Sequence, residues 1–115
     1  DTPLSFVIAN SVADFSGVQG QGGWDYGYRD FTATGRTMNY DPASAFIPFA
    51  GGSEAGTPYD GGLEGTQHWD GGKWDLFSPG DPWTEVGPES LHPNGTNGVA
   101  EHWVVRRWRA MAGAG

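Results

Sequence analysis

The chain has 115 residues and a formal net charge of −8, with 14 Asp and Glu against six Lys and Arg. This acidity argues against a nucleic-acid-binding protein, which needs basic residues gathered in a patch or stripe, and no apolar run is long enough to span a membrane. The lack of cysteine excludes disulfides and the common zinc and iron–sulfur ligand sets.

Twenty glycines and six tryptophans predict a turn-rich domain whose core is built from aromatic rings. Large aromatic side chains each bury much surface, which compensates for the scarcity of aliphatic residues. Abundant Gly, Asp and Trp with a single Lys favour a secreted, extracellular protein. We interpret residues 1–115 as a single β-rich module.

The first elements along the chain are a short strand and a glycine-rich loop. Residues 4–9 are apolar and β-branched, which predicts a strand, and residues 12–15 either continue it or pair again. Residues 16–23 are rich in glycine, but the Lys-Ser/Thr of a phosphate-binding loop does not follow them, so a nucleotide site is rejected.

Aromatic residues alternate strictly in the next segment, residues 24–31. Trp24, Tyr26 and Tyr28 recur at every second position, which predicts a strand with one aromatic face. Two shorter strands are expected after it, and nearby prolines make them edge strands. These shorter strands are residues 37–40 and 46–49.

Residues 51–92 are an irregular zone rich in Gly, Pro and Asp. An aromatic-Asp-Gly-Gly string occurs twice in it, at residues 59–62 and 69–72, and Asp-Gly pairs are strong turn signals. Short strands are expected between such turns. They are centred on residues 68–69, 74–77 and 83–86.

Residues 101–112 fit either a helix or a strand, and the adjacent Val104 and Val105 favour the strand. Arg106 and Arg107 then point to opposite faces, and one of them is expected to stack on a tryptophan or pair with a buried acid. Short strands separated by frequent turns, with no long amphipathic helix, predict an all-β fold of the β-sandwich or jelly-roll type.

Motifs in three segments, in one order, resemble a β-sandwich module of large secreted bacterial proteins. They are Asp-Phe-Ser, Gln-Gly and Trp-Asp-Tyr-Gly-Tyr within residues 14–28, Leu-His-Pro at 91–93, and Val-Val-Arg-Arg-Trp at 104–108. The resemblance implies a carbohydrate-binding-like jelly roll, of which this chain covers the N-terminal part. It therefore implies an incomplete sandwich that a second polypeptide or a self-copy completes.

Two kinds of ligand site are candidates. Aromatic rings beside short carboxylates suit stacking on a polysaccharide or other glycan, and the candidate rings are Trp69, Trp74, Trp83, Trp24 and Tyr26. Oxygen ligands in a glycine-rich segment suit calcium, although the spacing is not that of an EF-hand. The candidate calcium ligands are Asp60, Glu64, Asp70 and Asp75.

Three functions remain open from the sequence. The leading one is a non-catalytic, secreted, carbohydrate-binding-type module. The second is a structural or assembly segment that pairs with another polypeptide. The third is a fragment of a polysaccharide-degrading enzyme, which needs two carboxylates held at a fixed separation; no residue is singled out as catalytic.

Overall fold

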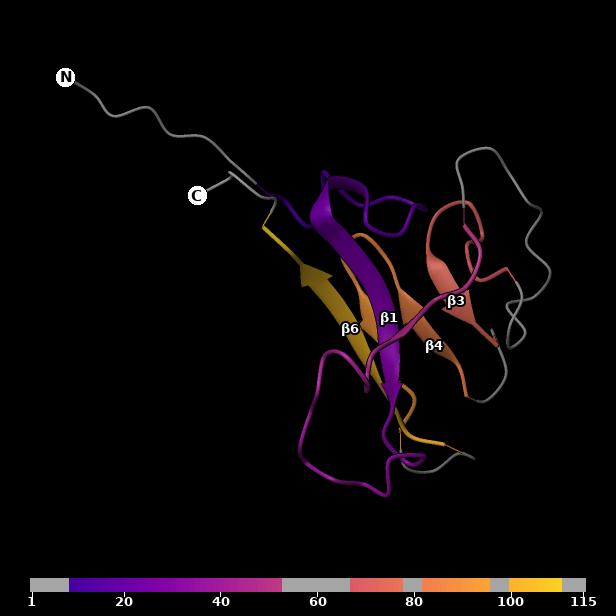
Figure 1. Cartoon of the computed structure of the whole chain (residues 1–115). Helices are drawn as coiled ribbons and strands as arrows, with labels where there is room; N and C mark the ends of the chain where they lie inside the picture. Colours follow the sequence, from indigo (N-terminus) through magenta and orange to yellow (C-terminus); the bar gives the residue numbers. More distant parts are fainter. Residues whose placement is uncertain (1–8, 53–66, 78–81, 96–99, 111–115) are drawn as a thin grey trace.

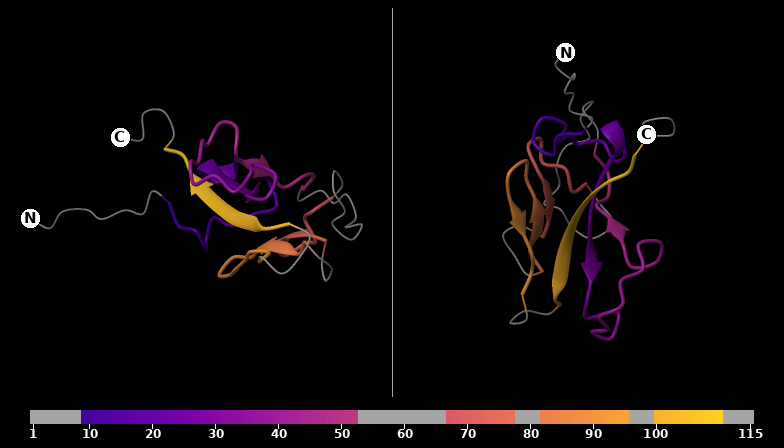
Figure 2. Two further views of the ribbon diagram at one scale, coloured as in Figure 1. Left: turned by 90° about the horizontal axis from the view of Figure 1, so that it is seen from below. Right: turned by 90° about the vertical axis from the view of Figure 1, so that its left-hand side faces the viewer.

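The computed structural model describes residues 9–52, 67–77, 82–95 and 100–110 (Figure 1). The elements are the 3₁₀ turn η1 (Gln21–Gly23) and the strands β1 (Trp24–Asp30), β2 (Ile47–Pro48), β3 (Trp74–Leu76), β4 (Thr84–Val86), β5 (Leu91–His92) and β6 (His102–Trp108). The strands form two three-stranded antiparallel sheets, in the orders β2-β1-β6 and β3-β4-β5, which lie as two layers in Figure 2. The all-β fold predicted from the sequence is confirmed.

The two longest strands, β1 and β6, pair along their whole length and lie side by side in Figure 1. Trp24 is opposite Trp108, and Asp30 is opposite His102. This pairing shows that the C-terminal segment is a strand rather than a helix. Strand β2 lies at the other edge of the sheet, the position expected for a strand that contains Pro48.

One face of β1 builds the core, as its alternating aromatic residues predict. Tyr26 and Tyr28 belong to the buried cluster, and Trp24 packs against it. The opposite sheet contributes side chains from β3 and β4, so the core lies between the two layers. The remaining buried members of the cluster are Phe49, Trp74, Leu76 and Val86.

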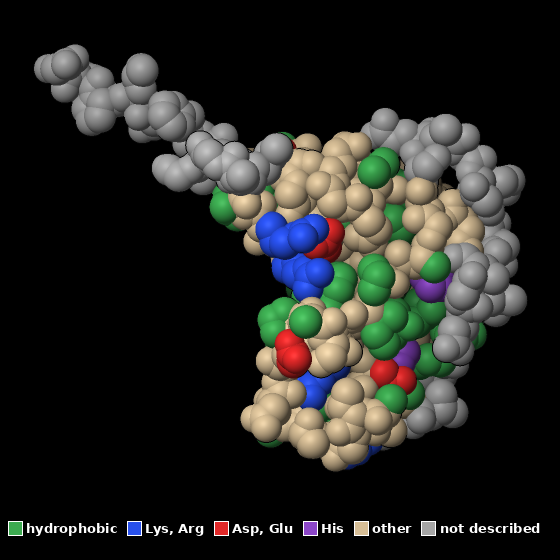
Figure 3. Space-filling view, in the orientation of Figure 1, with side chains coloured by type: hydrophobic (Ala, Val, Ile, Leu, Met, Phe, Trp, Pro, Cys, Tyr) green, Lys and Arg blue, Asp and Glu red, His purple; other side chains and the backbone are tan. Residues whose placement is uncertain are grey.

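The other face of β1 carries Asp25, Gly27 and Arg29. The buried Asp25 carboxylate pairs with Nε of Arg107 at 3.1 Å and with Nη2 of Arg109 at 3.2 Å. Since Arg106 packs beside the ring of Phe15, which contacts the core, the two central arginines of β6 point to opposite faces as predicted. In Figure 3 the basic side chains on the visible face lie beside acidic ones and form no basic stripe.

Arg29 is buried, and the loop that follows β1 wraps around it. Its Nη2 donates to the carbonyls of Thr37 at 2.7 Å and Asn39 at 2.9 Å. Its guanidinium also lies 5.2 Å from the ring centroid of Phe31 and 5.1 Å from that of Trp103. This arrangement ties the exposed loop to β1.

Two predicted strands are wrong. Residues 12–15 begin in a turn, because the Asn10 side chain accepts from the N–H groups of Val12 and Ala13 and competes with a strand ladder. Residues 37–40 form no strand, because carbonyls in this stretch turn toward Arg29 instead of a neighbouring strand. The strand predicted at residues 4–9 and the turn at 59–62 lie outside the described residues, except for Ala9.

In the described part of the chain, no helix has the length and hydrophobicity needed to cross a bilayer.

Candidate binding surfaces

Two of the five aromatic residues proposed for sugar stacking lie in the core. Trp74 and Tyr26 each have 0 % of their surface exposed, and their rings stack on one another at a centroid distance of 5.9 Å. The Trp74 indole N–H also donates to the carbonyl of Ser16 at 3.0 Å. Neither ring has a face to offer a sugar, so the expectation for these two residues is corrected.

Trp24 and Trp69 are half-buried and pack against the core. The Trp24 indole N–H donates to the carboxylate of Asp14 at 3.2 Å. The Trp69 ring covers Gly17 so closely that a Cβ there would lie 2.3 Å from ring atom Cε2. Both rings therefore have structural contacts that account for their presence.

Trp83 differs from the others because it lies on the outward side of sheet β3-β4-β5. Along β4 the burial alternates, with Thr84 and Val86 buried and Glu85 less so, which places Trp83 on the same side as Glu85. The half-buried Trp83 ring stacks on the exposed His92 ring at a centroid distance of 4.6 Å and an interplanar angle of 24°. We call Trp83, Glu85, His92 and Lys73 the Trp83 surface.

Polar groups surround this ring pair. Glu85 Oε1 accepts from Lys73 Nζ at 2.9 Å and from the Trp83 indole N–H at 3.3 Å. The hydrogen bond with Glu85 raises the pKa of Lys73, so the ammonium stays charged through the physiological range. His92 Nδ1 lies 3.2 Å from the Trp83 carbonyl, which can only accept, so Nδ1 carries the proton and Nε2 of the neutral ring is an acceptor.

The residues proposed to bind calcium are only partly described. Asp60 and Glu64 lie outside the described residues. Asp70 Oδ1 accepts from the N–H groups of Gly72 and Lys73, both at 2.8 Å, and so closes a turn. Asp75 is buried on β3. Within the described ranges, no three His, Asp or Glu side chains gather in the way that a metal ion requires.

A small pocket of about 230 Å³ lies where β1, β3 and β6 approach one another, and Asp30, His102 and Tyr28 help to line it. His102 Nδ1 lies 2.7 Å from the hydroxyl oxygen of Thr84, and its Nε2 lies 3.7 Å from Asp30 Oδ2. The order hydroxyl, imidazole, carboxylate is that of a nucleophilic triad. However, Thr84 is fully buried and donates to the carbonyl of Pro82 at 2.9 Å, so the network holds strands together and presents no nucleophile.

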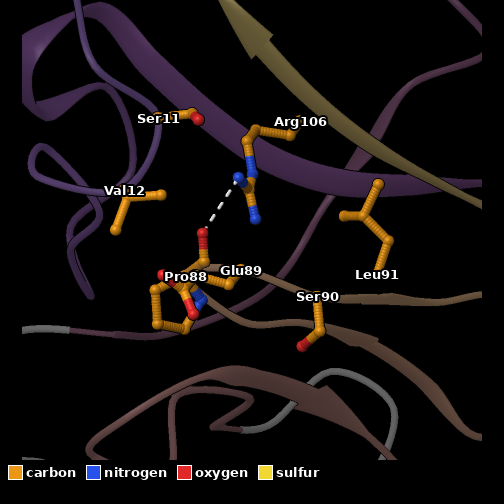
Figure 4. Close-up of a pocket in the computed structure, with 7 residues that line it drawn as sticks. All are labelled: Ser11, Val12, Pro88, Glu89, Ser90, Leu91 and Arg106. Carbon is orange, nitrogen blue, oxygen red and sulfur yellow. Dashed lines mark hydrogen bonds between the residues drawn. The ribbon is translucent and has the colours of Figure 1, made fainter.

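A larger groove of about 460 Å³ opens between β5 and β6 (Figure 4). Arg106 reaches from β6 toward the turn before β5, with Ser11 and Val12 on one side and Leu91 on the other. Its Nη1 donates to the carbonyl of Pro88 at 3.2 Å. We call this feature the β5–β6 groove; its lining residues are Ser11, Val12, Pro88, Glu89, Ser90, Leu91 and Arg106.

No family model, curated protein or solved structure matches this chain. Any functional conclusion therefore depends on the residues themselves.

The sequence contained a signal that separates Trp83 from Trp74. Trp74 alternates with the charged residues Lys73 and Asp75, which places its ring on the side opposite to them, whereas Trp83 shares its side with Glu85. The sequence contains no comparable indication that His92 belongs to the Trp83 surface, because β5 has only two residues and both are exposed.

Proposed function

We propose that the chain is a non-catalytic glycan-binding module of a secreted protein, and that it binds through the Trp83 surface. The observation that carries this proposal is the stacked pair of Trp83 and His92 beside a carboxylate and an ammonium group. Of the five aromatic candidates, Trp83 is the one on the outward side of a sheet whose ring is not part of, or packed against, the core cluster.

The chemistry of this surface fits a sugar. An indole ring offers an apolar face to the C–H groups of a pyranose, while sugar hydroxyls both donate and accept hydrogen bonds. Glu85 and Nε2 of His92 accept, and Lys73 donates. Because Glu85 and Lys73 already pair with each other and His92 is exposed to water, we expect weak binding that depends on several copies of the sugar along a polysaccharide.

Replacing Trp83 by Ala tests the proposal. Loss of one stacked ring is worth about 1 kcal/mol, so binding is expected to weaken about fivefold. The measurement is affinity electrophoresis or pull-down on a panel of insoluble and soluble polysaccharides. Trp83→Phe, which keeps a ring, should bind better than Trp83→Ala, and Ile47→Ala on the other sheet should bind like the parent chain. The proposal fails if no glycan is retained, or if Trp83→Ala is retained as well as Ile47→Ala.

We also propose that calcium binds the acidic segment containing Asp60, Glu64, Asp70 and Asp75. The chemistry of the donor set supports this, since carboxylates and loop carbonyls are the ligands that calcium prefers. A ligand at a hundred times its Kd stabilises the folded state by about 2.7 kcal/mol, so millimolar calcium is expected to raise the melting temperature by several degrees and EDTA to reverse the change. The double variant Asp60→Asn, Glu64→Gln should lose the response. An unchanged melting temperature for the parent chain contradicts this proposal.

A further inference from the structure

Strand β6 has an open edge. Arg109 N–H donates to the Gly23 carbonyl and Phe31 N–H to the Glu101 carbonyl, both at 2.9 Å. Hydrogen-bonded pairs alternate in an antiparallel ladder, so the odd-numbered residues of β6 bond to β1. The backbone groups of the even-numbered residues point away from β1, toward the β5–β6 groove.

A second ladder begins on this edge and stops. Asn94 and His102 exchange two backbone hydrogen bonds, at 3.2 and 3.0 Å. Further along β6, the backbone N–H and C=O groups of Val104 and Arg106 bond to none of the described residues. Such an edge is a template for an added strand, and in this chain the pair of Asn94 and His102 already forms the start of that ladder.

The groove beside this edge has apolar walls suited to side chains. Val12 is 46 % exposed and Leu91 is 52 % exposed. Leu91 is opposite Val86 in the register of β4 and β5 and therefore faces the inner side of its sheet, yet the described residues leave about half of its surface exposed. Aliphatic walls favour the side chains of a peptide over the hydroxyls of a sugar.

Arg106 gives the groove a positive charge that forms no ion pair, although Glu89 also lines the groove. Arg106 makes none of the ion pairs formed among the described residues. Its Nη atoms donate to the backbone carbonyls of Gly87 and Pro88, and its buried Nε has no hydrogen-bond partner. A carboxylate arriving in the groove would therefore find a guanidinium held in place and not neutralised.

We propose that the β5–β6 groove binds an extended, apolar segment of another polypeptide that carries an acidic side chain, and that this segment adds to β6 as a strand. Backbone groups of Val104 and Arg106 supply the ladder, Val12 and Leu91 contact alternate side chains, and Arg106 pairs with the carboxylate. A second copy of this chain fits less well, because two β6 strands paired edge to edge would bring arginines of both copies together, and each copy carries a net charge of −8. This site is independent of the Trp83 surface.

The test uses NMR to follow the binding of a blocked synthetic peptide, Ac-Thr-Val-Thr-Glu-Thr-Val-NH2, to the full chain; its two Val side chains and its Glu lie on one face of an extended strand. Binding is expected to slow hydrogen exchange at the amides of Val104 and Arg106. The same peptide with Lys in place of Glu should bind about tenfold more weakly, because the carboxylate that pairs with Arg106 is gone. Leu91→Asp, at an exposed position, should abolish binding, whereas Trp83→Ala should leave it unchanged.

Other outcomes overturn the proposal. If the Glu and Lys peptides bind equally well, Arg106 does not recognise a carboxylate. If neither peptide binds, the groove is not a peptide-binding site. If oligogalacturonate perturbs Arg106 and the peptides do not, the groove is an anionic saccharide site. If light scattering shows a dimer that Leu91→Asp dissociates, the occupant is a second copy.

Discussion

Trp74→Ala is expected to destabilise the domain by about 3–5 kcal/mol, the usual cost of removing a fully buried Trp. The ring lies 5.3 Å from Trp69 and 6.1 Å from Phe49, centroid to centroid, and is among the largest fully buried side chains. The free energy of unfolding of a domain is about 5–15 kcal/mol in total, so this substitution removes a large part of it. Urea denaturation followed by circular dichroism measures the change.

Two controls make this prediction specific. Trp74→Phe keeps an aromatic ring in the cavity and should lose less stability than Trp74→Ala. Trp83→Ala removes a tryptophan from the outward side of the sheet and should cost about 1 kcal/mol or less. Equal stability losses for Trp74→Ala and Trp83→Ala would contradict the assignment of one ring to the core and the other to the surface.

Arg29→Ala is expected to cost about 3 kcal/mol, because it removes hydrogen bonds from a charged donor together with cation–π contacts. It also releases the loop, whose Thr37 and Asn39 carbonyls accept from the guanidinium. Arg36 lies in this loop with half of its side chain exposed. Trypsin is therefore expected to cleave after Arg36 about tenfold faster in the variant, since cleavage follows local opening.

Arg29→Met provides the matched control for packing. The Met side chain keeps apolar contact with the rings of Phe31 and Trp103 but donates no hydrogen bond. It should therefore recover part of the stability while cleavage after Arg36 stays fast. Cleavage at the parental rate in both variants would show that Arg29 does not hold the loop.

The regular part of the fold could be predicted because its signals are local. Trp24, Tyr26 and Tyr28 alternate, and a period of two fixes a strand face. Pro48 restricts its strand to an edge, and the adjacent Val104 and Val105 favour extended backbone. Each of these features appears in the structure at the expected place.

The rest depends on contacts between distant segments. Residues 37–40 have the composition of a strand, but Arg29 donates hydrogen bonds to carbonyls of this stretch. The spacing of residues in the sequence does not predict that contact. The pairing of Trp83 with His92 likewise depends on the register between β4 and β5. The sequence therefore narrows the candidate site to a set of tryptophans and contains a signal that separates Trp83 from Trp74, while the packing of Trp24 and Trp69 against the core is known only from the fold.

The most direct test of glycan binding is an NMR titration that follows the indole N–H signals with an oligosaccharide of the best-retained polysaccharide. Binding at the Trp83 surface is expected to shift the Trp83 indole signal together with the amides of Glu85 and His92, while the signal of the buried Trp74 indole does not move. Shifts confined to Val104 and Arg106, or to no residue at all, would contradict binding at the Trp83 surface.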